Sequence, residues 1–253
     1  MTVRSLIRTV ALAVSVVLIS GAITGAWDVT INGRPTSDMD DTMSVAVDPD
    51  TGSIFVAGRR QVSSSLSQFF VVKFTADGRK EWQEVVEGTA DLGLRAGAAA
   101  VAVDPNGFVF VAGTIGNTDS AADFVIMKID GRSSRKHVLW TRVIDGLGYD
   151  DAVNAMALTP DGGVAVAGLV SIASGAYNFY LMKFTGDGQD AWPAPRIISG
   201  TAPDGSNAAT AVGILPNGDI AVTGWITKMR EVTRILLSAD STGQPGNVTG
   251  WWP

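Results

Sequence analysis

Carboxylates are the side chains of this chain best suited to chemistry. They gather at two equivalent points, just before apolar segments: Asp38, Asp40 and Asp41 at the first, and Asp150 and Asp151 at the second. Carboxylate oxygens placed in this way could bind Ca²⁺, or flank a glycosidic bond as acid and base. The simpler interpretation is that these acids cap strand ends and keep the surface soluble. We favour it because the two other equivalent points carry Ala96 and Ala208, with acids only at shifted positions.

Other groups that catalyse reactions or bind metals are scarce. The chain has no cysteine and one histidine, His137, which follows a basic stretch and is surrounded by no motif. Cysteine nucleophiles and Cys-His metal sites are therefore excluded. No phosphate-binding loop of the Walker type and no dinucleotide fingerprint is present. The sequence thus names no catalytic residue, and Ca²⁺ at the acids is the only cofactor it suggests.

The elements that must position these acids come from a repeated segment. Its four copies, residues 45–58, 101–113, 156–168 and 212–224, end in Gly58, Gly113, Gly168 and Gly224. These glycines are 55, 55 and 56 residues apart. A fixed period of this size indicates a repeat architecture, in which each unit buries its apolar faces against its neighbours.

Each copy carries the signals of several strands. Its centre holds a turn with Pro followed by Gly, as in Pro105-Asn106-Gly107, between two apolar runs, which predicts a β-hairpin. A third apolar strand is expected at residues 69–75, 124–130, 179–185 and 233–239. A fourth strand is expected near each of Trp82, Trp140, Trp192 and Trp251, with Trp27 at the same position before the first hairpin. Four-stranded units without helices predict the blades of a β-propeller.

Side-chain size predicts the order of strands within a blade. The strand rich in Val and Ala should be innermost, where the blades converge, and the Trp strand outermost, where a large side chain fills the gap between blades. Lysines recur in the third strand as Lys73, Lys128 and Lys183, and Leu236 stands in the fourth copy. We expect their stems to cover apolar surface and their ammonium groups to reach solvent.

The repeat also resembles a known family. Its third copy shows the pattern most fully, from Trp140 through Gly146, Asp151 and Pro160 to Gly168. This pattern resembles the bacterial β-propeller repeat of the SBBP type, found in exported and cell-surface proteins, and the resemblance extends from Trp27 to Trp251. It implies a propeller and an extracytoplasmic setting. It implies no particular activity, because the family is defined by structure.

The first residues predict export. Arg4 and Arg8 precede an apolar run, and small residues lead to Ala26, so residues 1–26 resemble a signal peptide cleaved near Ala26. An uncleaved anchor is the competing interpretation, but the apolar run is short for a bilayer. We expect a periplasmic, cell-surface or extracellular protein with no stable membrane span after cleavage. A formal net charge of -6 argues against nucleic acid as a partner.

Residues 27–253 are then one propeller domain with repeats at 27–81, 82–139, 140–191 and 192–250. Three arrangements stay open: a closed four-bladed ring, two chains paired into an eight-bladed ring as a homodimer, or part of a longer array. The expected function is a non-catalytic scaffold that binds a protein or glycan at the ring mouth or blade loops. The alternatives are a carboxylate- or metal-dependent enzyme acting on polysaccharide, and a repeat fragment of a larger surface protein.

Overall fold

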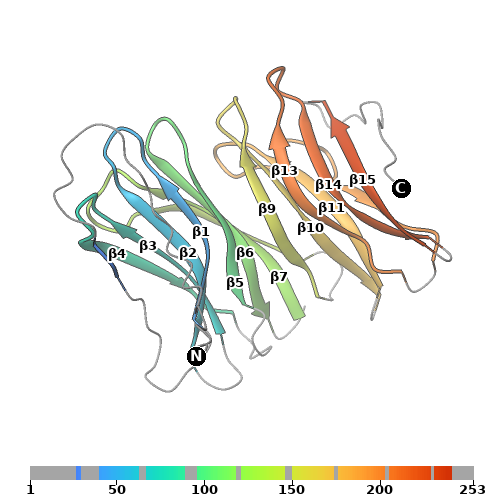
Figure 1. The fold of residues 1–253 in the computed structure, drawn as a ribbon, viewed down its shortest axis with the longest axis horizontal. Helices are drawn as coiled ribbons and strands as arrows, with labels where there is room; N and C mark the ends of the chain where they lie inside the picture. Colours follow the sequence, from blue (N-terminus) through green and yellow to red (C-terminus); the bar gives the residue numbers. More distant parts are fainter. Residues whose placement is uncertain are drawn as a thin grey trace, which may run out of the picture.

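The computed structural model describes residues 27–29, 40–62, 67–88, 96–117, 121–145, 150–173, 176–202, 205–228 and 231–240. Within these ranges the chain is all-β and forms four antiparallel sheets (Figure 1). The predicted signal peptide, Asp38 and Trp251 lie outside the described residues. No helix that could span a membrane is found in the part of the chain that the structure describes.

Each sheet is one blade, and its strands follow one another in chain order. Blade 1 contains β1 (Asp41–Val47), β2 (Ile54–Gln61), β3 (Ser67–Phe74) and β4 (Lys80–Val86). Blade 2 contains β5 (Gly97–Val103), β6 (Phe108–Asn117), β7 (Ala121–Asp130) and β8 (Val138–Ile144). Blade 3 contains β9 (Ala152–Leu158), β10 (Val164–Ala173), β11 (Ala176–Phe184) and β12 (Arg196–Ile198). Blade 4 contains β13 (Ala208–Ile214), β14 (Ile220–Lys228) and β15 (Glu231–Ala239).

The predicted blade architecture is confirmed. The hairpins and third strands lie where the repeats place them, and the Trp strands β4 and β8 are the outer strands of their sheets. The Val- and Ala-rich strands β1, β5, β9 and β13 contact one another in succession, as innermost strands should. The sheets of blades 1 and 2 run from an inner strand to a Trp strand, and in blade 3 the outer strand β12 begins four residues after Trp192. The division into blades therefore differs by one strand from repeats counted from Trp.

A bulge in each inner strand explains the glycine that ends every repeated segment. The register shifts by one residue opposite this glycine in all four blades. The bulge brings an inner-strand carbonyl over the glycine. A Cβ on Gly58 would lie 2.0 Å from the Asp41 oxygen, and one on Gly168 would lie 2.0 Å from the Ala152 oxygen. Any side chain here would therefore push the two strands apart.

Apolar side chains fill the space between neighbouring blades. Blade 2 has two buried faces: Phe110 and Ile126 belong to the core shared with blade 3, whereas Val111 and Met127 belong to the core shared with blade 1. This agrees with the expectation that a third strand apolar on both faces lies in a sandwiched sheet.

A shared carbonyl joins the outer parts of successive blades. The Trp82 indole N–H and the Lys73 ammonium of blade 1 donate to the Ser133 carbonyl of blade 2, at 3.2 and 3.3 Å. Trp140 and Lys128 of blade 2 donate in the same way to the Gly186 carbonyl of blade 3, at 3.2 and 2.9 Å. We call each set of tryptophan, lysine and accepting carbonyl a cross-blade anchor.

The cross-blade anchors correct two expectations about the lysines. Lys73 is only 4% exposed, so its ammonium does not reach solvent but ends against the next blade. The fourth-copy equivalent is Ser238 and not Leu236, because Lys73 lies opposite Phe55 and Ser238 opposite the corresponding Ala221. Trp82 and Trp192 are buried, as expected of side chains that fill gaps between blades.

The four blades form an open arc. Blade 1 and blade 4 lie at opposite ends of the row, with blades 2 and 3 between them (Figure 1). The closed four-bladed ring is therefore not observed among the described residues.

Candidate functional site

Two of the predicted acids cap strands at equivalent places. Asp40 Oδ1 accepts the Gln61 backbone N–H at 2.8 Å in blade 1, and Asp151 Oδ1 accepts that of Ser171 at 3.0 Å in blade 3. Gln61 and Ser171 each lie three residues after the glycine of the repeated segment. The two carboxylates thus satisfy an amide at the end of the second strand, which is the capping role expected of turn-region acids.

In the fourth blade an amide side chain caps the second strand in the same way. Asn207 Oδ1 accepts the Thr227 backbone N–H at 2.8 Å. The residue equivalent to Asp151 is therefore Asn207, and the alignment with Ala208 was wrong by one position, because the bulge and its partner Gly224 set the register. In blade 2 the equivalent residue is Ala96, as expected.

The remaining predicted acids are separated in space. Asp41 lies in β1 and forms an ion pair with Arg59. Inner strand β5 lies between β1 and β9, so Asp41 does not meet Asp150 and Asp151, which precede β9. Asp38 is outside the described residues. The acids that looked equivalent in sequence therefore belong to different blades and not to one site.

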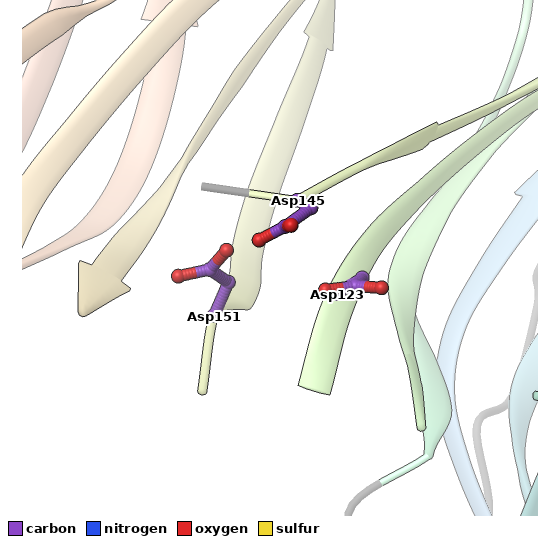
Figure 2. A group of neighbouring side chains, drawn as sticks. All are labelled: Asp123, Asp145 and Asp151. Atoms are coloured by element: carbon purple, nitrogen blue, oxygen red, sulfur yellow. The ribbon is translucent and has the colours of Figure 1, made fainter. Parts of the chain in front are cut away.

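Asp151 instead meets two acids that the sequence did not single out. Asp123, Asp145 and Asp151 each offer a carboxylate oxygen, and these oxygens all lie within 4.8 Å of one another. Figure 2 shows the three side chains, from β7, from the end of β8 and from the segment before β9. Asp123 and Asp151 are each 1% exposed, whereas Asp145 is exposed. We call this group the acidic triad.

The acidic triad is specific to the joint between blades 2 and 3. Strand pairing places Gln68, Glu87 and Ala96 at the equivalent positions between blades 1 and 2, and Asn178, Ser199 and Asn207 between blades 3 and 4. In those joints the polar groups pair: Gln68 donates to Glu87, and Asn207 donates to Asn178 at 3.3 Å. One sequence signal could have indicated this site. The third strands β3, β7 and β11 each have a polar residue just before their first Phe: Gln68, Asp123 and Asn178.

Three neighbouring carboxylates have limited chemical options. Buried like charges repel, so such a group is stabilised by sharing a proton or by a cation. The Asn117 side-chain amide donates to Asp123 Oδ2 at 2.5 Å and, because it is neutral, adds no positive charge to the group. A set made only of oxygen ligands suits a hard cation such as Ca²⁺ better than Zn²⁺.

A cavity of about 280 Å³ adjoins the acidic triad and shares Asp151 with it. Its lining comes from both blades: Thr114, Ala122, Asp150, Asp151, Ala152, Leu169 and Tyr177. The volume is near the lower end of small-molecule sites, which begin at about 300 Å³. Two acidic residues and an aromatic residue thus line one small space, whose exposed wall is mainly apolar.

Comparisons with known proteins bear on the fold alone. No family model and no curated protein matches the chain. Among solved structures, a Hadza microbial sialidase aligns with 82% of this chain at 12% identity and a TM-score of 0.48, and the chain spans 45% of its length. A neuraminidase-like protein of subtype N11 from an A/flat-faced bat/Peru isolate aligns with 86% of this chain and 58% of its own, at 12% identity and a TM-score of 0.44. A gluconolactonase from Xanthomonas campestris aligns with 81% and 74%, at 14% identity and a TM-score of 0.38.

Proposed function

We propose that this chain is an exported, non-catalytic β-propeller scaffold that binds a glycan in the cavity between blades 2 and 3. The observation that carries the proposal is the lining of that cavity, where Asp150 and Asp151 lie beside Tyr177 and Leu169. Carboxylates accept hydrogen bonds from sugar hydroxyls, and an aromatic ring packs on the apolar face of a sugar. The size of the cavity suits one sugar residue of a longer glycan.

Export and family membership belong to the same proposal. The signal-like residues 1–26 support secretion to the periplasm, the cell surface or the medium. The resemblance to the SBBP-type repeat supports the same setting. A binding scaffold also fits the described fold, because the repeated features hold blades together while the cavity occurs where one joint differs from the others.

The fourth blade suggests a conservative test of Asp151. Because Asn207 caps its strand as Asp151 does, Asp151→Asn should keep the cap and remove only the charge. Asp40→Asn is the matched control, since Asp40 makes the same cap in blade 1 and is not among the residues that line the cavity. The probe is an array of neutral, amino and acidic glycans, followed by calorimetry with the tightest one.

We expect Asp151→Asn to weaken glycan binding at least about tenfold, because it weakens a hydrogen bond to a charged group. Tyr177→Ala should also weaken binding, because it removes the ring that packs on the sugar. Asp40→Asn should bind like the unchanged protein. Asp40→Asn should unfold at the same urea concentration as the unchanged protein, and Asp151→Asn at the same or a higher one, because it removes one of three neighbouring negative charges. An array that shows no bound glycan, or equal weakening by Asp40→Asn, would reject the glycan and leave a protein ligand to be sought.

The second candidate function is a carboxylate- or metal-dependent enzyme acting on polysaccharide. The acidic triad favours it, because its oxygens are as close as those of paired catalytic carboxylates and could also bind Ca²⁺. The test is release of reducing sugar from a polysaccharide panel, with added Ca²⁺ or with a chelator. Activity lost in Asp145→Asn would support this candidate, and the absence of turnover on the panel under both conditions would remove it.

A further inference from the structure

The cavity between blades 2 and 3 lies where blade 2 carries two small side chains. One belongs to Thr114, the residue after the glycine of the repeated segment. The other blades have larger residues at this position: Arg59, Leu169 and Trp225. The second belongs to Ala122 near the start of β7, where the third strand of blade 3 carries Tyr177. Because protein interiors are close-packed, two small residues together leave room for a ligand.

The hydroxyl of Thr114 is a buried polar group that can accept a ligand as its partner. Thr114 lines the cavity and is 7% exposed. Within the part of the chain that the structure describes, its side chain makes no hydrogen bond. Buried polar groups are nearly always bonded, and leaving one unbonded is unfavourable. A ligand that offers an acceptor atom to Thr114 would therefore gain a hydrogen bond without breaking one inside the protein.

Apolar side chains make up most of the accessible wall. They belong to Ala122, Ala152 and Leu169, beside the ring of Tyr177. Sugar hydroxyls placed against this surface would lose their hydrogen bonds to water without replacement, which is unfavourable. A methyl group placed there would leave water, which is favourable. The wall therefore favours a sugar that carries a methyl group.

The acids of the wall determine which polar groups a ligand can bring. Asp150 is half-buried, whereas Asp151 is 1% exposed and its Oδ1 accepts the Ser171 N–H. Asp150 is therefore the more accessible acceptor. A carboxylate accepts hydrogen bonds from N–H groups and repels a second carboxylate. The cavity thus favours a ligand with an N–H donor and disfavours acidic sugars.

We propose that the sugar recognised in this cavity is an N-acetylhexosamine residue of a glycan. Its acetamido carbonyl accepts from the Thr114 hydroxyl, and its N–H donates to Asp150. Its methyl group packs against Ala122 and Leu169, and the sugar ring packs on Tyr177. One small group thus supplies the acceptor, the donor and the apolar surface that the wall requires. This inference rests on the proposed glycan-binding function and specifies the class of sugar.

Three trisaccharides with one backbone test this choice of sugar. Triacetylchitotriose, its deacetylated form chitotriose and cellotriose differ only at C2, which carries an acetamido, ammonium or hydroxyl group. Calorimetry with the unchanged protein should give a Kd for triacetylchitotriose at least about tenfold below that for cellotriose, through a hydrogen bond and a buried methyl group. Equal affinities overturn the inference. Tighter binding of chitotriose also overturns it, because charge alone would then determine the preference.

Thr114→Val tests the hydroxyl, since it removes this group and nearly keeps the shape of the side chain. It should weaken binding of triacetylchitotriose by roughly tenfold, because the acetamido carbonyl is left without a partner. Thr114→Ser should restore most of the affinity. Thr114→Val should unfold at the same or a higher urea concentration than the unchanged protein, because the hydroxyl has no bond to lose in the described residues.

The matched control is Thr141→Val, the same substitution at an exposed position of β8 that does not line the cavity. It should bind triacetylchitotriose like the unchanged protein. Unchanged binding by Thr114→Val, or equal weakening by Thr141→Val, overturns the inference.

Failure of this inference can be distinguished from failure of the proposed function. If the array identifies glycans that need Asp151, but triacetylchitotriose binds no more tightly than cellotriose, the glycan site stands and the choice of N-acetylhexosamine is wrong. If neither the array nor the trisaccharides show binding, both are wrong. A peptide containing N-acetyl-lysine is the last probe. If it binds more tightly than triacetylchitotriose, it overturns the inference and assigns the site to a protein ligand.

Discussion

At the scale of single residues, the lysines of the third strands act as structural cations. Lys73 forms an ion pair with Glu81 at 2.7 Å and donates to the Ser133 carbonyl of the next blade. Its side chain is 5% exposed and that of Glu81 is 16% exposed. Burying a charge is unfavourable without partners, so the buried Lys73 ammonium depends on Glu81 of its own blade and on the carbonyl of the next blade. Lys73 thus links the stability of blade 1 to the presence of blade 2.

We expect Lys73→Met to lower the free energy of unfolding by about 3 kcal/mol, because it leaves Glu81 buried without its cation. Lys136→Met is the control, since Lys136 pairs with Glu84 but is 47% exposed, and exposed pairs contribute less than about 1 kcal/mol. Urea denaturation measures both. Equal effects of the two variants would contradict a structural role for the buried pair, whereas recovery in Lys73→Met/Glu81→Gln would support it.

At the scale of elements, turns and bulges determine where each blade meets the next. The turns after β3 and β11 share one structure, in which Thr75 donates to Asp77 and Thr185 to Asp187. Gly78 and Gly188 follow with φ of +84° and +83°. These turns present the carbonyls of Ala76 and Gly186, to which the indoles of Trp27 and Trp140 donate. Local turn chemistry therefore builds the accepting half of the cross-blade anchor.

Two turn glycines allow the cost of backbone strain to be distinguished from the cost of a clash with tryptophan. Gly188 and Gly162 have φ of +83° and +82°, so alanine at either position costs about 1–2 kcal/mol for the backbone alone. A Cβ on Gly188 would lie 2.9 Å from Trp140, whereas one on Gly162 meets nothing within 4 Å. Gly188→Ala should therefore destabilise the protein more than Gly162→Ala, as measured by thermal denaturation. The reverse order would argue against a close contact of Trp140 with this turn.

The same turns make the free energy of unfolding depend on pH. The Thr75 hydroxyl lowers the pKa of Asp77 by hydrogen bonding to its carboxylate, and the Thr185 hydroxyl does the same for Asp187. Since each folded-state pKa lies below its unfolded value, the stabilisation is complete above about pH 4 and is lost as the pH falls through the folded pKa. The free energy of unfolding should fall more gently with acid in Asp77→Asn/Asp187→Asn than in the unchanged protein. Parallel pH profiles would refute this contribution.

At the scale of the whole molecule, the blades form a linear array in which each one contacts mainly its neighbours. Trp82 belongs to the core between blades 1 and 2, and Trp140 packs against the core shared by blades 2 and 3. In such arrays stability is close to a sum of unit and interface terms. Mutations in the two joints should therefore change the free energy of unfolding independently, although blade 2 takes part in both joints.

This additivity can be measured with two tryptophan variants. Trp82→Ala and Trp140→Ala should each lower the free energy of unfolding by about 3 kcal/mol, through loss of a large apolar group. The double variant should lose the sum to within about 0.5 kcal/mol, because the two sites share no core. Urea denaturation of all four proteins gives the comparison. A coupling above about 1 kcal/mol would show that strain passes through blade 2.

Much of the architecture could be predicted from the sequence, because its signals are local. The Pro-Gly turns, the apolar strands and the spacing of the tryptophans each lie within a few tens of residues, and they recur. They therefore determined the strands, their order in a blade and the number of hairpins. The glycine at the end of each repeated segment was visible as well, but its reason, the carbonyl of the bulged inner strand, lies in the pairing of two strands.

The tertiary structure decided which side chains share a site. Asp123, Asp145 and Asp151 come from three elements of two blades, and no spacing in the chain announces that they meet. Strand register identified Asn207 and Ser238 as the equivalents that counting along the sequence had missed. Burial of Lys73 likewise depends on the next blade. The sequence by itself determined what each blade is, through local turn and strand preferences, and only the stacking of blades decided where the buried charges and the cavity lie.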